Sequence, residues 1–515
     1  MTRIVLPLVP APSRPRLRTA LAFAAGLTLA LPAAAQTLNG EVRALIEKHG
    51  LGGAKIGVVL ADLNTGRTLA AVNADDPLIP ASNMKLLTSA AAISVLGPGF
   101  AFTTEFVLVG DRLMVRGSGD PALGDPELLK EMGVGVEPLL EKWVDAVKQA
   151  GAGAVREVVV DDRIFDREFA HPTWPKDQLN RWYCAEIGGV NFHTNILSVF
   201  ARPGAPETAP SISTEPRADW LEIQNRAVSK AQGQNSVWAS RSPDGATMTV
   251  YGNVRFALEE PVDVAISNPP ASFARLLADR LRSAGLGAPT GRLAAADEPQ
   301  TEGRVVAVVR SPMEVILRRC NVNSYNLYAE ALIKRMGHEV THQPGSWDNG
   351  AAVIRMTLQE KLGPADAAAV TIADGSGMSR ENRVSAGVMS RWLAAMIKDP
   401  RVGPPLVASM PVAQKDGSLR SRFSKDRLRT EIRAKTGYIK NVSCLSGVIT
   451  EPSTGARVVF SILVNDFPAK AGVRGAKDFH EDVVLLGSDW LLKQTQADAK
   501  RGRGERAGAD QPSGR

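Results

Sequence analysis

Apolar residues near the start of the chain recur first with the spacing of a helix and then with that of a strand. A stripe of apolar positions three to four residues apart predicts a helix over residues 37–49. Apolar runs over 55–62 and 67–72, separated by the turn-forming Asn64-Thr65-Gly66, predict a β-hairpin. A second helix is expected from Ser82 to Ser94, because a proline precedes this apolar segment and a Gly-Pro pair ends it.

The middle of the chain has a different pattern from its end. From about residue 99, short strand-like runs alternate with turns, and the segment 203–245 is rich in Pro, Ser, Thr and Asn, which favours irregular or loosely β structure. Helices are expected there only at 136–150 and 271–285. The last third returns to long periodic segments, which predict helices at 312–336, 349–362, 385–398 and 479–494 and strands at 431–438, 443–450 and 456–464.

These elements predict an α/β (α+β) fold around an antiparallel sheet of five strands drawn from both ends of the sequence. The terminal helices are expected on one face of the sheet, and the helices of 82–96 and 312–400 on the other. Residues 36–98 and 308–495 would then form one discontinuous domain. Residues 99–307 form an inserted region, expected as two small β-rich domains, and the polar residues 496–515 are expected to be a disordered tail.

The first 35 residues have the pattern of a secretory signal. Four arginines precede a short apolar run over 21–31, and Ala33-Ala34-Ala35 forms a small-residue cleavage site. A retained membrane anchor is the alternative, but the apolar run is too short to span a bilayer. We therefore expect a cleaved signal peptide, export to the periplasm and no transmembrane segment in the mature chain.

Composition and charge exclude several classes of protein. The 515 residues are 44% hydrophobic and 22% charged, which is globular and excludes a disordered, fibrous or many-pass membrane protein. The formal charge of +7 belongs to the two ends, and the body from 36 to 495 has a net charge of about +1. A nucleic-acid partner would need a basic face on that body, so none is expected.

Three cysteines, Cys184, Cys320 and Cys444, permit at most one disulfide and are too widely spaced for a zinc site. We expect them to be buried and inert, although the sequence leaves open whether two of them pair. The six histidines include no H-E-x-x-H pattern. No metal ion and no cofactor is therefore expected.

The candidate nucleophile lies in the S-x-x-K segment Ser82-Asn83-Met84-Lys85. Helical residues three apart share one face, so the Lys85 amine can reach the Ser82 hydroxyl. A serine needs a base to take its proton, and a lysine can serve when burial or a nearby cation lowers its pKa. Alone, this pattern is equally typical of a helix-capping serine followed by a solvated lysine.

Two further motifs follow in order. Ser324-Tyr325-Asn326 is an S-x-N, and Lys435-Thr436-Gly437 is a K-T-G at the end of a strand-like run. Each alone also fits a polar helix junction or a strand that ends at a glycine. The same trio occurs in serine β-lactamases and penicillin-binding proteins. No G-x-S-x-G is present, so a histidine-based triad has no anchor.

With these motifs the sequence resembles the exported D-alanyl-D-alanine carboxypeptidase/endopeptidase family, the class C low-molecular-mass penicillin-binding proteins. The resemblance covers most of the mature chain. The first two motifs are separated by 242 residues, whereas compact β-lactamases keep them much closer. The other similar stretches are Gly117 to Pro121 (GSGDP), Asp161 to Asp166 (DDRIFD), Asn321 to Glu330 (NVNSYNLYAE), Asp374 to Arg380 (DGSGMSR), Asn382-Arg383 and Asp416 to Leu419 (DGSL).

The resemblance implies a serine β-lactamase/transpeptidase-like domain and a serine-type D-Ala-D-Ala peptidase of the cell wall. Its substrates would be peptidoglycan stem peptides, and β-lactams would be covalent inhibitors. Ser82 would attack the penultimate D-Ala carbonyl and Lys85 would accept its proton. Ser324 would relay a proton to the leaving amine, and Asn326 would position Lys85 and the peptide.

The resemblance also implies a set of binding residues. Lys435, Thr436 and Gly437 would hold the terminal carboxylate, and the Tyr438 N–H would join that of Ser82 in an oxyanion hole. Three further residues would contact the side chain of the stem peptide: Arg380 from the DGSGMSR stretch, and Asp161 and Phe165 from the inserted region.

Two positions depart from the family pattern. Tyr438 follows the K-T-G where a small hydroxyl residue is commoner, which puts in doubt one contact with the substrate carboxylate. Val322 replaces a frequent lysine, which puts in doubt one positive charge near Lys85. Two other functions remain open: a β-lactamase, and a cell-wall-binding scaffold with a degenerate cleft. The sequence does not separate carboxypeptidase from endopeptidase, nor exclude transpeptidation, and it does not give the oligomeric state.

Overall fold

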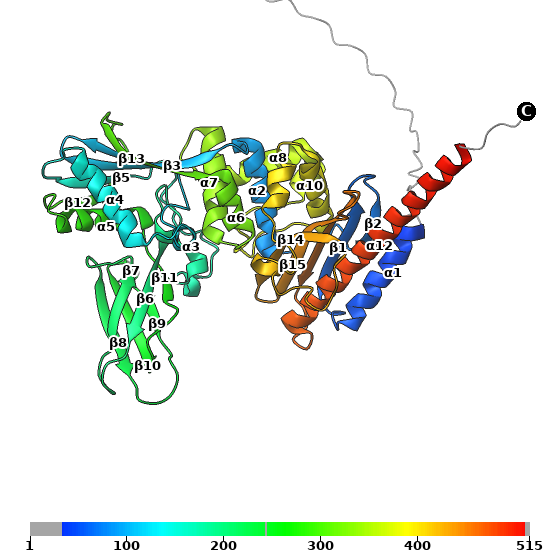
Figure 1. Ribbon diagram of the computed structural model, residues 1–515, viewed down its shortest axis with the longest axis horizontal. Helices are drawn as coiled ribbons and strands as arrows, with labels where there is room; N and C mark the ends of the chain where they lie inside the picture. The colour runs from blue at the N-terminus through cyan, green and yellow to red at the C-terminus, as the bar shows by residue number, and fades with distance from the viewer. Residues whose placement is uncertain (1–32, 243–244, 510–515) are drawn as a thin grey trace, which may run out of the picture.

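The computed structural model describes residues 33–242 and 245–509. Figure 1 shows an elongated molecule in which a helix-covered sheet lies at one end and the residues between α2 (Met84–Leu96) and α6 (Met313–Asn321) extend to the other. The predicted signal over 1–35 falls on residues of which 1–32 lie outside the described part of the chain. Within the described ranges, no helix is both long and apolar enough to cross a bilayer.

The main sheet confirms the predicted fold class. Its five strands pair in the order β14-β15-β16-β1-β2, and all neighbours are antiparallel. Strand β1 from the start of the chain pairs with β16 near its end, with Lys55 opposite Asn465. The strands are β1 (Lys55–Asp62), β2 (Thr68–Val72), β14 (Glu431–Ile439), β15 (Val442–Thr450) and β16 (Arg457–Asn465).

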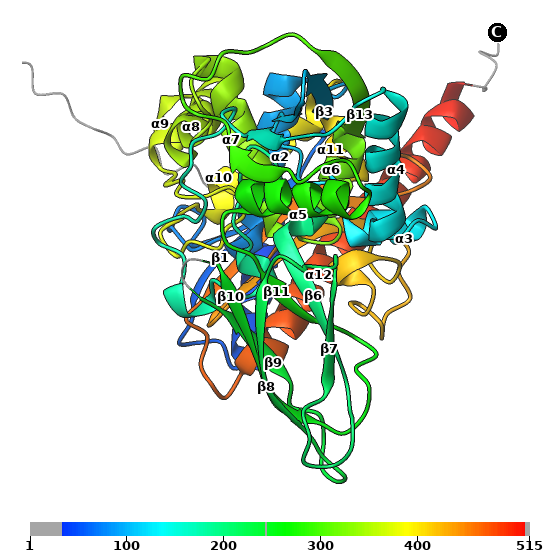
Figure 2. The same cartoon turned by 90° about the vertical axis from the view of Figure 1, so that its left-hand side faces the viewer.

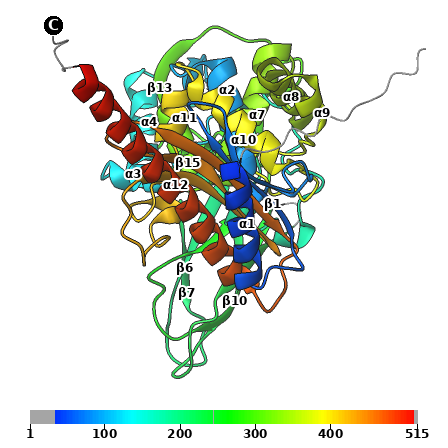
Figure 3. The same cartoon turned by 90° about the vertical axis from the view of Figure 1, so that its right-hand side faces the viewer.

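Helices cover both faces of this sheet. Figure 3 shows α1 (Ala33–Lys48) and α12 (Gly472–Ala509) side by side on one face, where Val42, Phe479 and Val483 are fully buried. On the other face, α2 (Met84–Leu96) is buried from Met84 to Ile93, as a helix surrounded by protein must be. The remaining helices of that layer are α6 (Met313–Asn321), α7 (Asn326–Thr341), α8 (Trp347–Leu362), α9 (Pro364–Ala368), α10 (Ala386–Lys398) and α11 (Gly403–Ala408).

One prediction about helices was wrong. The single helix expected over 312–336 is two helices, because the backbone leaves helical geometry between Asn321 and Asn326 and Ser324 adopts a positive φ of 62°. In the part of the tail that the structure describes, α12 continues as far as Ala509.

The inserted residues form three further sheets (Figure 2). One is five-stranded, in the order β12-β5-β4-β3-β13, with α3 (Pro126–Glu131), α4 (Val136–Gln149) and α5 (Pro269–Ser283) near it. Strand β13 begins before the boundary expected at 307 and pairs with β3. The segment that enters the inserted region and the segment that leaves it therefore lie side by side. The strands are β3 (Ala101–Val109), β4 (Arg112–Gly117), β5 (Glu157–Asp161), β12 (Thr290–Leu293) and β13 (Arg304–Pro312).

The other two inserted sheets are three-stranded and pack around one small core that includes Val199, Val250 and Val264. Their orders are β11-β6-β7 and β8-β10-β9. Three of these strands lie in the segment 203–245, for which the composition predicted irregular or loosely β structure. The strands are β6 (Ile196–Arg202), β7 (Ser211–Glu215), β8 (Glu222–Ser229), β9 (Trp238–Arg241), β10 (Thr247–Val254) and β11 (Val262–Ala265).

Candidate active site

Ser82 lies in a short 3-10 turn, Ala81–Asn83, that leads directly into α2. Ala81 has a positive φ of 45°, so the chain turns sharply before the helix begins. One helical turn after Ser82, the Lys85 ammonium donates a hydrogen bond of 3.1 Å to the Ser82 hydroxyl. The S-x-x-K spacing thus places the two groups in contact, with Ser82 half-buried and Lys85 wholly buried.

Lys85 is held by two further partners. Its Nζ donates to the amide oxygen of Asn326 at 2.6 Å and to the carbonyl of Ser376 at 2.9 Å. Burial lowers the pKa of the Lys85 ammonium to about 8, against the opposing effect of Glu330 and other nearby acidic groups. A substantial fraction of Lys85 is therefore neutral near physiological pH and able to accept a proton.

The S-x-N motif occupies the break between α6 and α7. Asn326 is the first residue of α7, and its amide nitrogen donates to the carbonyl of Tyr183 at 2.8 Å. Ser324 precedes the helix in left-handed geometry and accepts a hydrogen bond of 2.8 Å from Lys435. The hydrophobic pattern did not predict this break between the two helices. At the break, the Ser324 and Asn326 side chains face the other two motifs.

The K-T-G motif lies on β14, the edge strand of the main sheet. Lys435 is fully buried, and its Nζ also donates to the Thr436 carbonyl at 2.9 Å. Burial and the positive charge of Lys85 hold the pKa of Lys435 well below its ordinary value. The Thr436 hydroxyl donates to Ser418 at 2.8 Å.

Gly437 brings β14 against the turn that holds Ser82. A Cβ at this position would lie 2.8 Å from the Pro80 carbonyl oxygen and 3.1 Å from the Ser82 amide nitrogen. Real Cβ atoms rarely come so close, so the glycine permits this approach. The N–H of Ser82 and the strand that continues into Tyr438 therefore lie beside each other.

Two buried carboxylates brace the DGSGMSR loop behind Lys85. Glu330 on α7 accepts from the backbone N–H groups of Gly375 and Ser376 at 3.0 and 2.9 Å and from the indole of Trp347 at 2.8 Å. Burial and the neighbouring Asp374 raise the pKa of Glu330 to about 7. Sequence reasoning assigned Glu330 no role, although it ends the NVNSYNLYAE stretch; a charged residue at a helix position expected to be buried was the available signal.

Gly377 in this loop lies against the turn that holds Ser82. Its φ is +86°, and a Cβ there would lie 1.8 Å from the Ala81 carbonyl oxygen. We expect Gly377→Ala to lower kcat by at least about tenfold, because the turn must move away from Lys85. Gly363→Ala is the control, since Gly363 has a similar φ of +93° but open space around its Cβ position.

Thermal unfolding measures the stability of both variants, and steady-state kinetics measures their kcat. Equal destabilisation of the two proteins, with unchanged kcat in Gly377→Ala, would contradict the proposed contact between loop and turn.

Ser82 opens into a cleft of about 710 Å³. One wall comes from the inserted residues, which contribute Thr173, Gln178, Trp182 and Tyr183. That wall is attached to the loop behind Lys85, because Thr173 and Ser379 share a hydrogen bond of 2.6 Å. The other lining residues are Pro175, Asn323, Ser324, Asn326, Gly377, Met378, Arg380, Tyr438, Ile439, Lys440 and Asn441.

Most of the predicted site residues meet at this cleft. Ser82, Ser324, Asn326, Arg380 and Tyr438 line it, and Lys85, Lys435, Thr436 and Gly437 lie directly behind or beside it through the contacts above. Arg380 donates to the Lys440 carbonyl at 2.9 Å, and Tyr438 is 56% exposed, so both side chains are available to a ligand at the cleft.

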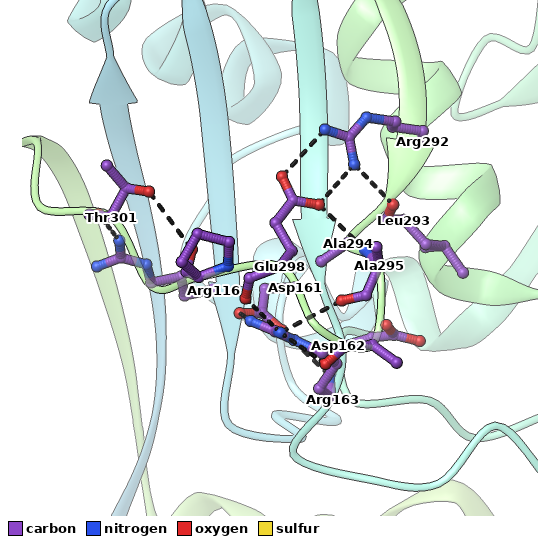
Figure 4. Close-up of polar contacts among 12 residues, drawn as sticks. Arg116, Asp161, Asp162, Arg163, Arg292, Leu293, Ala294, Ala295, Glu298 and Thr301 are labelled. Carbon is purple, nitrogen blue, oxygen red and sulfur yellow. Dashed lines mark hydrogen bonds and ion pairs between the residues drawn. The ribbon is translucent and has the colours of Figure 1, made fainter.

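Asp161 and Phe165 are not brought to the cleft. Figure 4 shows Asp161 paired with Arg163, which also donates to backbone carbonyls of the loop around Glu298. Phe165 is 1% exposed and lies over Gly119, where its ring would collide with a Cβ. Both residues are occupied in packing, and the inserted region instead reaches the cleft through the later segment from Thr173 to Tyr183.

All three cysteines are buried with free thiols, as expected. Among the residues that the structure describes, no group of three His, Cys, Asp or Glu side chains is arranged to hold a metal ion.

Comparison with known proteins identifies the family. Residues 38–483 match the model of the D-Ala-D-Ala carboxypeptidase 3 (S13) family, and the chain belongs to this family of serine-type peptidases. A D-alanyl-D-alanine carboxypeptidase of Actinomadura sp. (strain R39) is 30% identical over 92% of this chain and 88% of its own length. The carboxypeptidase DacB of Haemophilus influenzae is 23% identical over 81% of this chain and 86% of its own.

A solved structure shows the same fold. Penicillin binding protein 4 of Haemophilus influenzae matches with a TM-score of 0.69 at 21% identity, over 86% of this chain and 99% of the other. The family, the fold class and the enzyme class predicted from the sequence are thereby confirmed.

Proposed function

We propose that the protein is an exported DD-peptidase that cleaves D-Ala-D-Ala bonds, or the equivalent cross-links, in peptidoglycan stem peptides. The observation that carries this proposal is that hydrogen bonds bring three distant motifs together at one cleft. Lys85 contacts both Ser82 and Asn326, the latter 241 positions away in the sequence, and Lys435 reaches Ser324 across 111 positions. The names of the Actinomadura and Haemophilus relatives support the same substrate class.

Acylation starts from the Ser82–Lys85 contact. The Ser82 hydroxyl attacks the carbonyl of the penultimate D-Ala, and its proton passes to neutral Lys85. The N–H groups of Ser82 and Tyr438 donate to the oxyanion as charge develops on it. The C–N bond then breaks, and Ser324 relays a proton to the leaving amine, so that an acyl-serine and a free amine result.

Lys435 and Thr436 hold the carboxylate that follows the scissile bond. Burial disfavours the positively charged form of Lys435. A substrate carboxylate beside it supplies a negative charge, which favours the ammonium form in the complex. Asn326 holds Lys85 and hydrogen-bonds the peptide backbone. Tyr438 provides its backbone N–H, but not the small hydroxyl that is frequent after K-T-G.

Hydrolysis of the ester completes the cycle. A water molecule replaces the departed amine, gives a proton to Lys85 and attacks the acyl carbonyl. The ester C–O bond then breaks, and Lys85 returns the proton to the Ser82 oxygen, so that the Ser82 hydroxyl and a peptide carboxylic acid result. Arg380, which lines the cleft, is proposed to contact the side chain of the stem peptide.

The site of action is proposed to be the periplasm. The Haemophilus influenzae relative is named a D-alanyl-D-alanine carboxypeptidase, and D-Ala-D-Ala is the end of the proposed stem-peptide substrate. The leader pattern over residues 1–35 supports export. Sequencing the N-terminus of the protein recovered from the periplasm tests this, and an N-terminus at Met1 would contradict cleavage.

Mass spectrometry after brief incubation with a penicillin tests the proposed chemistry. A stable adduct on Ser82, together with release of D-Ala from a soluble stem peptide, is the expected result. Rapid loss of the drug without an adduct would indicate the β-lactamase alternative. An intact drug and no adduct would leave the cell-wall-binding scaffold as the better interpretation.

A further inference from the structure

Two aromatic side chains stand together on the outer face of the β8-β10-β9 sheet. Trp238 on β9 pairs directly with Tyr251 on β10, and their rings stack at 4.2 Å with 13° between the planes. Trp238 is 50% exposed. Strand β9 lies at an edge of this sheet.

The rest of this face is polar and flat. Arg226 on β8 is paired with Tyr251, and the next row holds Ser240, Thr249 and Gln224. The alternate residues, which include Ala239 and Val250, are buried against the other three-stranded sheet. We call the outer set the Trp238 face: Gln224, Arg226, Trp238, Ser240, Thr249 and Tyr251.

The Trp238 face adjoins the wall of the active-site cleft. Asn180, between the cleft-lining residues Gln178 and Trp182, donates to the carbonyl of Ala239 at 3.2 Å. Arg241 on the same strand donates to the Leu179 carbonyl at 3.1 Å. Asn180 is two residues from Trp182, and Ala239 is next to Trp238. Because Asn180 and Ala239 are hydrogen-bonded, the Cα atoms of Trp182 and Trp238 lie at most about 20 Å apart.

We propose that the Trp238 face binds the glycan strand of peptidoglycan while the attached stem peptide occupies the cleft. An aromatic ring offers a flat apolar surface to the C–H face of a sugar ring, and neighbouring hydroxyl, amide and guanidinium groups hydrogen-bond its hydroxyl and N-acetyl groups. The inference rests on the proposed function, because a stem peptide in the cleft brings its glycan strand within reach of the segment 178–182, to which β9 is hydrogen-bonded.

A purely structural role explains less of what is seen. A cross-strand aromatic pair does stabilise a sheet. That role does not require half of a tryptophan to stay in water, where its apolar area is unfavourable. A ligand that covers the indole accounts for both the stacking and the exposure.

The first test measures binding of a peptide-free N-acetylglucosamine tetramer to the full mature chain by heteronuclear NMR titration. We expect millimolar affinity, weakened at least about tenfold in Trp238→Thr. Threonine keeps β propensity, so the strand is retained. The matched control is Val308→Thr, which changes a 48% exposed residue on another edge strand, β13.

The second test compares two substrates. Trp238→Thr is expected to raise KM for intact peptidoglycan sacculi about tenfold and to leave turnover of a soluble stem peptide unchanged. Absence of tetramer binding by the unmodified protein, or equal binding by Trp238→Thr, would overturn the proposal. An effect on sacculi without tetramer binding would overturn it too, since it would assign the face to a peptide or protein partner.

Failure of the proposed function is recognised separately. An unmodified protein that does not cleave soluble stem peptide fails as a DD-peptidase, whereas the tetramer titration involves no peptide and no catalysis.

Discussion

Ser82→Ala is expected to form no penicillin adduct and to lose at least about 10⁴-fold in kcat/KM on a soluble stem peptide. The substitution removes the atom that would carry the acyl group, and no other hydroxyl can take its place. Ser324 is oriented by Lys435 rather than by Lys85, whose Nζ lies 3.1 Å from the Ser82 hydroxyl. Intact-protein mass spectrometry and peptide mapping measure the adduct, and release of D-Ala measures turnover.

Ser94→Ala is the matched control for this variant. Ser94 lies on the same helix, α2, one residue beyond its fully buried stretch, so the same chemical change is made away from the cleft. Its adduct and turnover are expected to equal those of the unmodified protein. An adduct in Ser82→Ala would assign the nucleophile to another residue and would remove the basis of the mechanism.

The sequence predicts the main sheet well because its strands carry their own signals. Residues 55–62 and 456–464 are apolar runs long enough to lie between two helical layers, and the structure pairs them across the sheet. Their pairing could not be derived from periodicity, because a contact between residues 400 positions apart depends on how the whole chain packs. The resemblance, not the pattern, supplied that arrangement.

The break before α7 shows what periodicity does not detect. Residues on either side of Ser324 keep the apolar spacing of one helix, since α6 and α7 both pack on α2. Ser324, with its positive φ, contacts Lys435, 111 residues later in the chain. A local pattern contains no information about such a contact, so the motif was identified correctly while its helix was not.

The inserted region gave the least reliable site prediction. Asp161 and Phe165 were chosen from a resembling stretch, but Asp161 pairs with Arg163 and Phe165 fills the space above a glycine. The wall of the cleft comes instead from Trp182 and its neighbours, in a loop with little regular structure. Its position is fixed by tertiary hydrogen bonds such as that from Asn326 to the Tyr183 carbonyl.

The pH dependence of acylation is expected to follow Lys85. Only the neutral amine can accept the Ser82 proton, and burial lowers its pKa to about 8. Below pH 8 the neutral fraction rises about tenfold per pH unit, so the rate of penicillin acylation should rise from pH 6 and level off above pH 8. Stopped-flow measurement of adduct formation from pH 6 to 9 gives this profile.

Lys85→Ala is expected to lower the acylation rate about 10³-fold and to remove the rise between pH 6 and 8. The exposed Lys415, outside the residues that line the cleft, provides the control variant Lys415→Ala, which should keep both rate and profile. The loss of rate alone does not identify the base, because a buried lysine also fills space next to Asn326. The loss of the pH dependence does, since packing does not titrate. A Lys85→Ala protein that is slow but still gains tenfold per pH unit would assign the titrating base to another group, such as the buried amine of Lys435.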